Sequence, residues 1–325
     1  SPDAEIFAEN ECFDNQPISF IDTSTNGTGA IDSWNWTISG GNYVFPDTNT
    51  TQHPSYIFDN CGVKTIYLTV TDSLTCTDSD TIDVNVYCLP EADFSVDNVC
   101  FGIETPFNDL TTPTGTITNW NWIFHNATTL SIPPPILYEF DSCGNYTAQL
   151  VVTDNNNCID SSSIKPFDVY CLPTASFEFD SVCEGIETPI WSVSQSGNNP
   201  SAPIDSWNWT FNNTTSSDSS LTHIFSDCGP FPVTLIVTDT NTCNSELYTD
   251  NVFVNCNPDA NILTQNDCFN TQPIQFTDSS INGTGNINSW DWEITGGIYN
   301  SPDTNTTTSP GFIFDDCGIK TVYLT

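Results

Sequence analysis

The sequence predicts an all-β protein, built as a tandem array of small β-sandwich domains. Apolar and polar residues alternate along segments such as 65–70 and 82–86, which is the period of a half-buried strand. No segment carries the apolar stripe of a helix. A W-x-W segment recurs about every 83 to 87 residues, at 32–36, 118–122, 205–209 and 288–292. This spacing suits whole domains. Seven or so strands per ~85 residues, separated by Asn, Gly, Pro and Asp, describe an immunoglobulin-like sandwich.

Further markers repeat in a fixed order and set the domain boundaries. FDNCG, FDSCG, FSDCG and FDDCG begin at 58, 140, 225 and 314, and VYCLP, VYCLP and VNCNP close the first three repeats. The predicted domains are therefore 1–88, 89–171, 172–256 and 257–325. Residues 257–325 align with 1–69 without a gap, and about 42 of the 69 positions are identical. We expect the fourth domain to be a truncated copy of the first, cut from a longer array.

Composition excludes some partners. The net charge is -38, and the basic residues are Lys64, Lys165 and Lys320, so no basic patch can neutralise nucleic acid phosphates or an anionic membrane surface. A hydrophobic share of 37% and an aromatic share of 12% are too high for a disordered acidic chain. No apolar run approaches the ~20 residues of a membrane span. Fourteen cysteines at recurring positions indicate an oxidising, extracellular or cell-surface location.

These motifs carry a family resemblance. A short first strand such as ADFSVD (92–97), the W-x-W segment, an approach such as PILYEF (135–140), and GNYTAQLVVTD (144–154) together resemble the PKD domain, and the likeness covers every repeat. Where that family commonly carries W-D-F-G-D-G, this chain has WNWTISGG and its variants, so the acidic tight turn is missing. Cysteine-bearing PKD arrays of this composition resemble large surface proteins of Bacteroidota that are exported by the type IX route.

The paired tryptophans are the main candidates for the domain cores. Residues i and i+2 of a strand share a face, so each pair is either buried or displayed, and the PKD resemblance implies that both rings point inward. The alternative is a platform on which carbohydrate stacks. Trp191 has no counterpart in the other repeats and is the better candidate for an exposed ring, and packing at a sheet edge is the alternative that we favour. The predicted core tryptophans are Trp34, Trp36, Trp120, Trp122, Trp207, Trp209, Trp290 and Trp292.

The cysteines are predicted to bridge both within and between domains. In such a sandwich, Cys12 at the start of the second strand and Cys61 in a later turn lie at the same end. Cys76 and Cys88 lie some 12 residues apart along an extended strand, too far for a bridge. Cys88 faces the next domain, where Cys158 occupies a turn. The predicted pairs within domains are Cys12–Cys61, Cys100–Cys143, Cys183–Cys228 and Cys268–Cys317, and those between domains are Cys88–Cys158 and Cys171–Cys243. Alternatively, the late cysteines are free or pair otherwise.

Other chemistry is sparse. His53, His125 and His223 occupy non-equivalent positions, and no catalytic motif or zinc spacing occurs in the sequence. We therefore expect neither an enzyme nor a cofactor. Calcium is the one metal considered, because recurrent carboxylates close a strand beside the domain junctions. Turn-forming residues satisfied by backbone are the alternative. The weak calcium candidates are Asp72, Asp78, Asp154, Asp160 and Asp239.

Two functions follow from these observations. The first is a structural segment of an extracellular filament or giant cell-surface adhesin, used in attachment, gliding or prey capture. Its chains would self-associate into a homo-oligomeric filament or bundle. The second is a set of carbohydrate-binding accessory PKD modules of a secreted enzyme that degrades polysaccharide or protein. The close copy of the first domain by the fourth favours the structural role.

Overall fold

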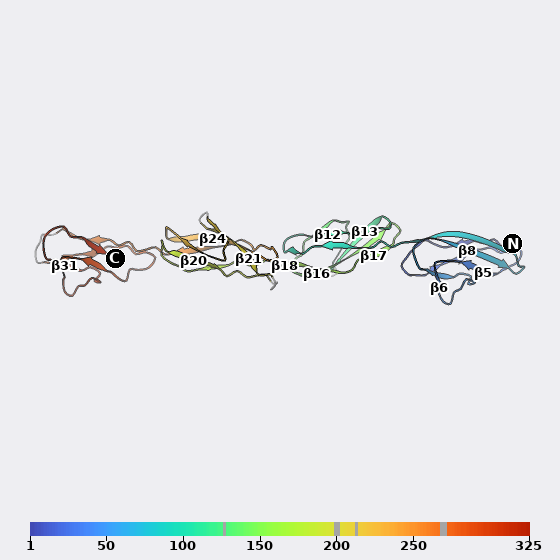
Figure 1. Ribbon diagram of the computed structural model, residues 1–325, viewed down its shortest axis with the longest axis horizontal. Coiled ribbons are helices and arrows are strands. Elements are labelled where there is room, and N and C mark those ends of the chain that lie inside the picture. The colour runs from blue at the N-terminus through green and yellow to red at the C-terminus, as the bar shows by residue number, and fades with distance from the viewer. Residues whose placement is uncertain (126–127, 198–201, 212–213, 267–271) are drawn as a thin grey trace. The chain divides into compact units, whose positions relative to one another are not determined.

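A computed structural model describes residues 1–125, 128–197, 202–211, 214–266 and 272–325. These residues form strands and turns, and no helix occurs among them. The chain divides into two compact units, Ser1–Tyr170 and Cys171–Thr325, which are coloured from blue to green and from yellow to red in Figure 1. Each unit contains two sandwiches with separate hydrophobic cores. We call them the first to the fourth sandwich in chain order.

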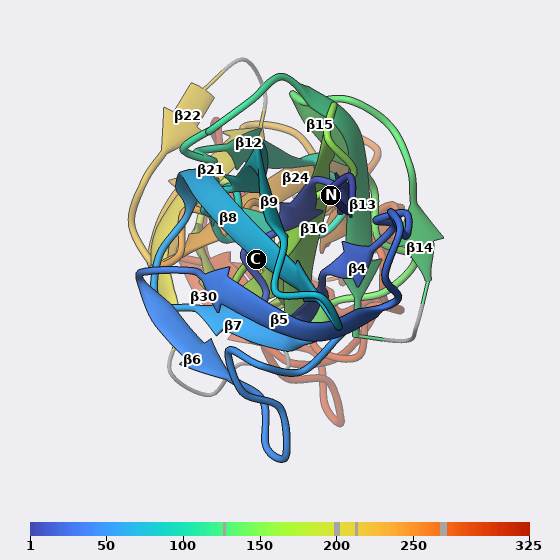
Figure 2. The ribbon, with the colours of Figure 1, turned by 90° about the vertical axis from the view of Figure 1, so that its right-hand side faces the viewer.

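The first sandwich contains two sheets of the immunoglobulin type. One sheet has the order β3-β7-β6, and the other has the order β2-β9-β8-β5. Strands β1 and β4 form a separate pair. Strand β2 runs parallel to β9, whereas the other pairings are antiparallel. In Figure 2, β6 and β7 lie below β8 and β9. The strands are β1 (Ile6–Phe7), β2 (Glu11–Cys12), β3 (Ile18–Ser19), β4 (Ile21–Asp22), β5 (Ile31–Thr37), β6 (Gly41–Tyr43), β7 (Ser55–Phe58), β8 (Gly62–Asp72) and β9 (Thr77–Tyr87).

The second sandwich repeats this plan. Its sheets have the orders β10-β12-β15 and β11-β18-β16-β13-β14, and β17 also pairs with β16. Strand β11 runs parallel to β18, as β2 does to β9. The strands are β10 (Phe94–Val96), β11 (Val99–Cys100), β12 (Thr105–Asp109), β13 (Ile117–Phe124), β14 (Thr129–Leu130), β15 (Ile136–Tyr138), β16 (Gly144–Asp154), β17 (Ile159–Ser161) and β18 (Lys165–Tyr170).

The third and fourth sandwiches form the other unit. The third has sheets β19-β20-β23 and β22-β21-β24-β25, and the fourth has β27-β31-β30 with the pairs β26-β28 and β29-β32. The strands are β19 (Phe177–Phe179), β20 (Glu187–Ser192), β21 (Ile204–Phe211), β22 (Thr214–Ser216), β23 (Ser220–Ile224), β24 (Gly229–Asp239), β25 (Tyr248–Val254), β26 (Ile262–Leu263), β27 (Ile274–Gln275), β28 (Thr277–Asp278), β29 (Trp292–Ile294), β30 (Gly297–Tyr299), β31 (Gly311–Phe314) and β32 (Val322–Leu324).

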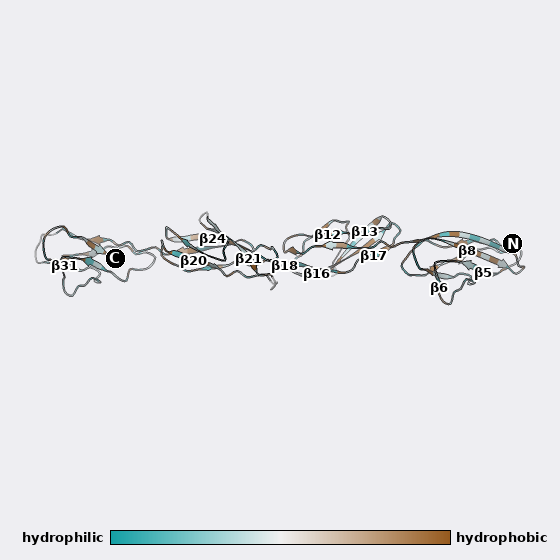
Figure 3. Ribbon diagram, in the orientation of Figure 1, coloured by the Kyte–Doolittle hydropathy of each residue, from teal (hydrophilic) through white to brown (hydrophobic). Residues whose placement is uncertain are grey.

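Alternation along the long strands builds each core. In β8, Ile66, Leu68 and Val70 are fully buried, while the residues between them face outward or are half-buried. Figure 3 shows brown, apolar segments spaced along the strands of this sandwich. Each buried aliphatic side chain contributes roughly 1.5–3 kcal/mol relative to an exposed one. The predicted tandem array of all-β, immunoglobulin-like sandwiches is confirmed.

Candidate functional site

The paired tryptophans lie in the four cores. The second member of each pair is at most 2% exposed, and the first is half-buried against the same cluster. Trp36, for example, packs against Phe20 and donates its indole N–H to the carbonyl of Thr51 at 2.9 Å. The buried members are Trp36, Trp122, Trp209 and Trp292, and the half-buried ones are Trp34, Trp120, Trp207 and Trp290. Trp191 in β20 is also half-buried.

A carboxylate anchors the half-buried tryptophan in three of the four sandwiches. Asp22 accepts the Trp34 indole N–H at 2.7 Å, and Asp109 and Asp278 do the same for Trp120 and Trp290, both at 2.8 Å. The third sandwich differs. Ser192 pairs with Phe177 as Asp22 pairs with Ile6, and the buried indole nitrogen of Trp207 has no hydrogen-bond partner among the described residues. These Asp–Trp pairs were not among the sequence-based predictions.

Ser192→Asp is expected to stabilise the third sandwich. An unpaired buried donor costs roughly 1–3 kcal/mol, and an aspartate here can accept the Trp207 indole N–H as its counterparts do. We expect a gain of about 1 kcal/mol in the free energy of unfolding at pH 7. Hydrogen exchange of the β24 amides (Gly229–Asp239), followed by mass spectrometry, measures this change for the third sandwich alone.

The reverse variant Asp22→Ser provides the control in the first sandwich, and its effect should depend on pH. Burial alone raises the pKa of Asp22, but the hydrogen bonds that its carboxylate accepts, chiefly from Ser24 and Trp34, hold the pKa below its ordinary value. Such a group stabilises the fold above its unfolded pKa of about 4, and this stabilisation is lost as the pH falls through the folded pKa. The destabilisation by Asp22→Ser should therefore be largest near neutrality and shrink in acid. If Ser192→Asp and Asp22→Ser changed the free energy of unfolding in the same direction, this interpretation would be wrong.

The same cysteine-bearing turn follows β8, β16 and β24. In each, an aspartate Oδ1 accepts the backbone N–H groups two and four residues later, and the second of these belongs to a cysteine. The residue before the cysteine, a threonine in two turns and an asparagine in the other, has a φ between 64° and 67°, a conformation that β-branched threonine rarely adopts. The turn thus holds a cysteine in a fixed position. The three turns are Asp72–Cys76, Asp154–Cys158 and Asp239–Cys243.

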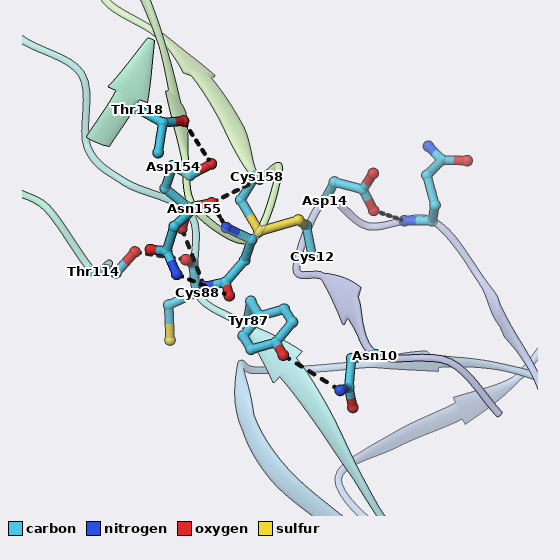
Figure 4. The surroundings of a disulfide bond; sticks show 12 residues. Asn10, Cys12, Asp14, Tyr87, Cys88, Thr114, Thr118, Asp154, Asn155 and Cys158 are labelled. Carbon is cyan, nitrogen blue, oxygen red and sulfur yellow. Dashed lines mark hydrogen bonds between the residues drawn. A yellow bond between two sulfur atoms is a disulfide. The ribbon is translucent and has the colours of Figure 1, made fainter. Parts of the chain in front are cut away.

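In the second sandwich this turn forms a covalent junction with the first sandwich. Cys158 is fully buried, and its sulfur is bonded to Cys12 with a Cα–Cα distance of 5.5 Å across 146 residues of sequence. Cys12 ends β2 and lies beside Tyr87 of β9. Figure 4 shows the bridge between the two segments, with the Cys88 sulfur pointing away from it. The Thr114 hydroxyl adds a hydrogen bond to the Cys88 carbonyl at 2.7 Å.

Three predicted pairings are wrong. Cys12–Cys61 and Cys88–Cys158 are replaced by Cys12–Cys158 and Cys61–Cys88. Cys183–Cys228 is replaced by Cys228–Cys256. The register of the long hairpin explains the difference: Gly62 pairs with Val86 and Gly229 with Val254. The cysteine before each glycine therefore meets the cysteine that follows the partner strand, with Cα–Cα distances of 5.0 and 4.8 Å.

The remaining cysteines fall into three groups. Cys76, Cys183 and Cys317 are free among the described residues. Cys100, Cys143, Cys171 and Cys243 are each disulfide-bonded, and the pairings Cys100–Cys143 and Cys171–Cys243 stay predictions. The predicted partner of Cys317, Cys268, lies outside the described residues. A covalent link between successive sandwiches is present, but Cys12 provides it in place of Cys88.

Glycines in two loops allow close contacts with the backbone where the third and fourth sandwiches begin. A Cβ on Gly197 or Gly283 would lie 2.2 or 2.1 Å from the carbonyl oxygen of Cys171 or Cys256, respectively. Thr284 then exchanges two hydrogen bonds with Cys256, one to its carbonyl and one from its N–H. The repeated N-G-T-G at 26–29 and 282–285 is the sequence signal that could have predicted this contact.

The carboxylates considered for calcium bind backbone amides. Asp72, Asp154 and Asp239 accept two N–H groups each within their turns. Asp78 and Asp160 accept the N–H of Ala4 and Ala92, both at 2.8 Å. Among the described residues, no group of three or more His, Cys, Asp or Glu side chains is placed to hold a metal ion. Asp72, Asp154 and Asp239 thus have the geometry of turn-forming residues, whereas Asp78 and Asp160 connect segments that are distant in the sequence.

Fold and junctions define a tandem array of immunoglobulin-like sandwiches in which disulfides bridge strands and successive domains. A sequence profile of the PKD domain matches residues 1–86 and 172–254, more than half of the chain. The chain belongs to the PKD-domain family. PKD domains and multiple disulfides are typical of extracellular proteins, and no helix able to cross a membrane occurs in the described parts of the chain.

Several solved structures are similar to this chain. The PKD1 domain of the Vibrio cholerae metalloprotease PrtV is 27% identical, with a TM-score of 0.22, over 26% of this chain and 96% of its own. The PKD1 domain of Vibrio anguillarum Epp is 25% identical, with a TM-score of 0.22, over 26% and 95%. Three N-terminal domains of the bacteriophage RB49 outer capsid protein Hoc are 13% identical, with a TM-score of 0.35, over 78% and 95%. No curated protein matches the chain.

Proposed function

We propose that this chain is a load-bearing segment of an extracellular filament or giant cell-surface adhesin, used in attachment, gliding or prey capture. The observation that carries the proposal is the Cys12–Cys158 bond, which joins two successive sandwiches. The role requires neither a chemical reaction nor a metal. Tandem PKD domains with several disulfides fit an extracellular structural or adhesion module.

The position of this bond determines how tension passes through the chain. A pulling force that enters at Ser1 reaches Cys12, crosses to Cys158 through the sulfur atoms, and continues from there. Residues 13–157 lie outside this covalent path, so unfolding of the two sandwiches cannot lengthen the chain by that segment. A segment built in this way resists extension even when its sandwiches unfold.

The chain is further proposed to self-associate laterally into a homo-oligomeric filament or bundle and to contact a cell surface or polysaccharide. Its source is proposed to be a member of the Bacteroidota that exports it by the type IX route. Support for these finer points is the acidic, Asn- and Thr-rich composition and the close repetition of the first domain in the fourth.

Single-molecule pulling on the whole chain tests the load-bearing role. With the Cys12–Cys158 bond closed, unfolding should add no contour length from the 146 residues that it spans. Full reduction should release that segment, which amounts to about 500 Å at 3.3–3.6 Å per residue. The matched control is Cys76→Ser, which removes a free, exposed thiol and should leave the oxidised trace unchanged. Equal extension of the oxidised and reduced chains would contradict the proposal.

A further inference from the structure

The outer face of the three-stranded sheet of the second sandwich carries exposed apolar side chains. Pro106 of β12 and Leu137 of β15 lie opposite each other in the register, and Leu137 is 59% exposed. Because the two strands are antiparallel, the residues after β12 and those before β15 extend this face towards the same end. They include Leu110 and Ile132, which are 54% and 41% exposed, and two exposed prolines. We call this set the apolar strip, and its members are Pro106, Leu110, Ile132, Pro133, Pro135 and Leu137.

The fold does not require apolar side chains at these positions. The corresponding central pair of the same strand contact is Ser19 and Ser55 in the first sandwich and Gln275 and Gly311 in the fourth. These sandwiches form the contact with polar or minimal side chains. Contiguous exposed apolar residues on a folded domain mark interaction surfaces, so the apolar strip is a candidate for one.

The apolar strip is free of charge in a strongly acidic chain. None of its members is ionisable, and Asn108, the exposed residue of β12 between Pro106 and Leu110, is neutral. The chain as a whole has 41 acidic residues and a net charge of -38. Two such chains repel each other wherever carboxylates face one another. An uncharged apolar face is therefore the surface on which an equally acidic partner can approach.

The lysines are already engaged within their own chain. Lys165 pairs with Asp93 at 2.6 Å and lies over the Phe94 ring, 5.0 Å from its centre. The other two have the same kind of surroundings, namely Asn60 and Phe58 for Lys64, and Asp316 and Phe314 for Lys320. Contact between copies therefore has to come from apolar burial rather than from ion pairs.

The corresponding face of the third sandwich is less suited to contact between copies. Trp191 lies on it, but Glu178 stands opposite Trp191 in the register, and Glu187 stands opposite Ile224. Two copies that met through this face would bring glutamates together. This comparison favours the second sandwich.

We propose that two copies of this chain associate laterally through the apolar strip, each strip covering that of the other copy. The contact is isologous, because the same surface serves both partners. Burial of the leucines and prolines drives it, and the absence of charge limits the repulsion between the chains. This inference rests on the lateral self-association in the proposed function and names the surface that carries it.

Sedimentation equilibrium of the whole chain tests the proposal, with free thiols alkylated and EDTA present. Leu110→Asp with Leu137→Asp should raise the dissociation constant of the dimer at least about tenfold, because carboxylates would then face each other across the contact. The matched control is Ile159→Asp with Ile164→Asp, which adds the same charge at exposed positions of the same sandwich outside the strip. It should change the constant by no more than about twofold. Hydrogen exchange of the β16 amides should be equal in all three chains.

Salt dependence separates apolar contact from ionic contact. Raising NaCl from about 0.05 M to about 0.5 M should strengthen the association, because salt screens the repulsion between two acidic chains. Association that weakens with salt, or that is equal in the two double variants, would overturn the proposal.

Two further outcomes assign the failure. A chain that stays monomeric at high micromolar concentration would overturn both the strip contact and lateral self-association, whereas the load-bearing role, tested by pulling single chains, would stand. A monomeric chain that cellulose or agarose beads retain, and that Leu137→Asp releases, would assign the strip to a polysaccharide in place of a second copy.

Discussion

Trp36→Ala is expected to remove about 3–5 kcal/mol from the unfolding free energy of the first sandwich. The ring is 2% exposed, packs against Phe20 and donates to the Thr51 carbonyl. Alanine leaves a large cavity and an unsatisfied carbonyl. Small domains have only about 5–15 kcal/mol of stability, so the first sandwich should be close to unfolding at 37 °C. Exchange of the β8 amides should accelerate by two to three decades, because each 1.4 kcal/mol is tenfold.

Asn35→Ala is the matched control for this prediction. Asn35 lies between the two tryptophans and is exposed, so its replacement should change stability by no more than about 0.5 kcal/mol. If Trp36→Ala cost less than about 1 kcal/mol, the ring would not be a central part of the core.

Replacing Cys61 and Cys88 together by serine is expected to destabilise the first sandwich by about 3–4 kcal/mol. The bond closes a loop with a sequence separation of 27, and opening it restores that much chain entropy to the unfolded state. The double variant avoids an unpaired thiol. Exchange of the β9 amides, measured without reductant, should accelerate by two to three decades in the first sandwich.

Cys76→Ser controls for the loss of a cysteine as such. This residue is exposed and free, and its replacement should leave exchange of the first sandwich within a factor of about two. If the double variant behaved like Cys76→Ser, the Cys61–Cys88 bond would add no stability, and the register argument for its placement would lose its energetic support.

Periodicity was sufficient to predict the fold. Alternation at Ile66, Leu68 and Val70 identifies β8 without ambiguity, because a one-residue shift would turn all three to solvent. The repeated W-x-W segments identify the cores for the same reason. Those parts of the fold depend on local pattern, which a single sequence displays directly.

The disulfides depended on a detail that no local pattern reveals. Cys12, Cys61 and Cys88 lie at the same end of the first sandwich, and the sequence does not show which two pair. The choice is set by β2, a strand of two residues that is too short to show any period. The sequence-based prediction placed Cys12 at the start of the next long strand, whereas it ends β2 and lies beside Tyr87. The register of β8 against β9 then brings Cys61 next to Cys88, so these two cysteines form the disulfide.

The Asp–Trp pairs were missed for a different reason. Asp22 and Trp34 lie on strands of different sheets, so their contact is a property of packing. Comparison between repeats could have found it, since aspartate recurs at 22, 109 and 278 whereas serine stands at 192.

The long span of the Cys12–Cys158 bond also has a consequence for biogenesis. If the chain is exported with its N-terminus first, Cys61 and Cys88 become available for pairing with Cys12 long before Cys158. During that interval Cys12 can form a wrong bond with either of them until they pair with each other. Correct maturation is therefore favoured by early closure of the Cys61–Cys88 bond, by oxidation after both sandwiches have emerged, or by an isomerase that reopens premature bonds.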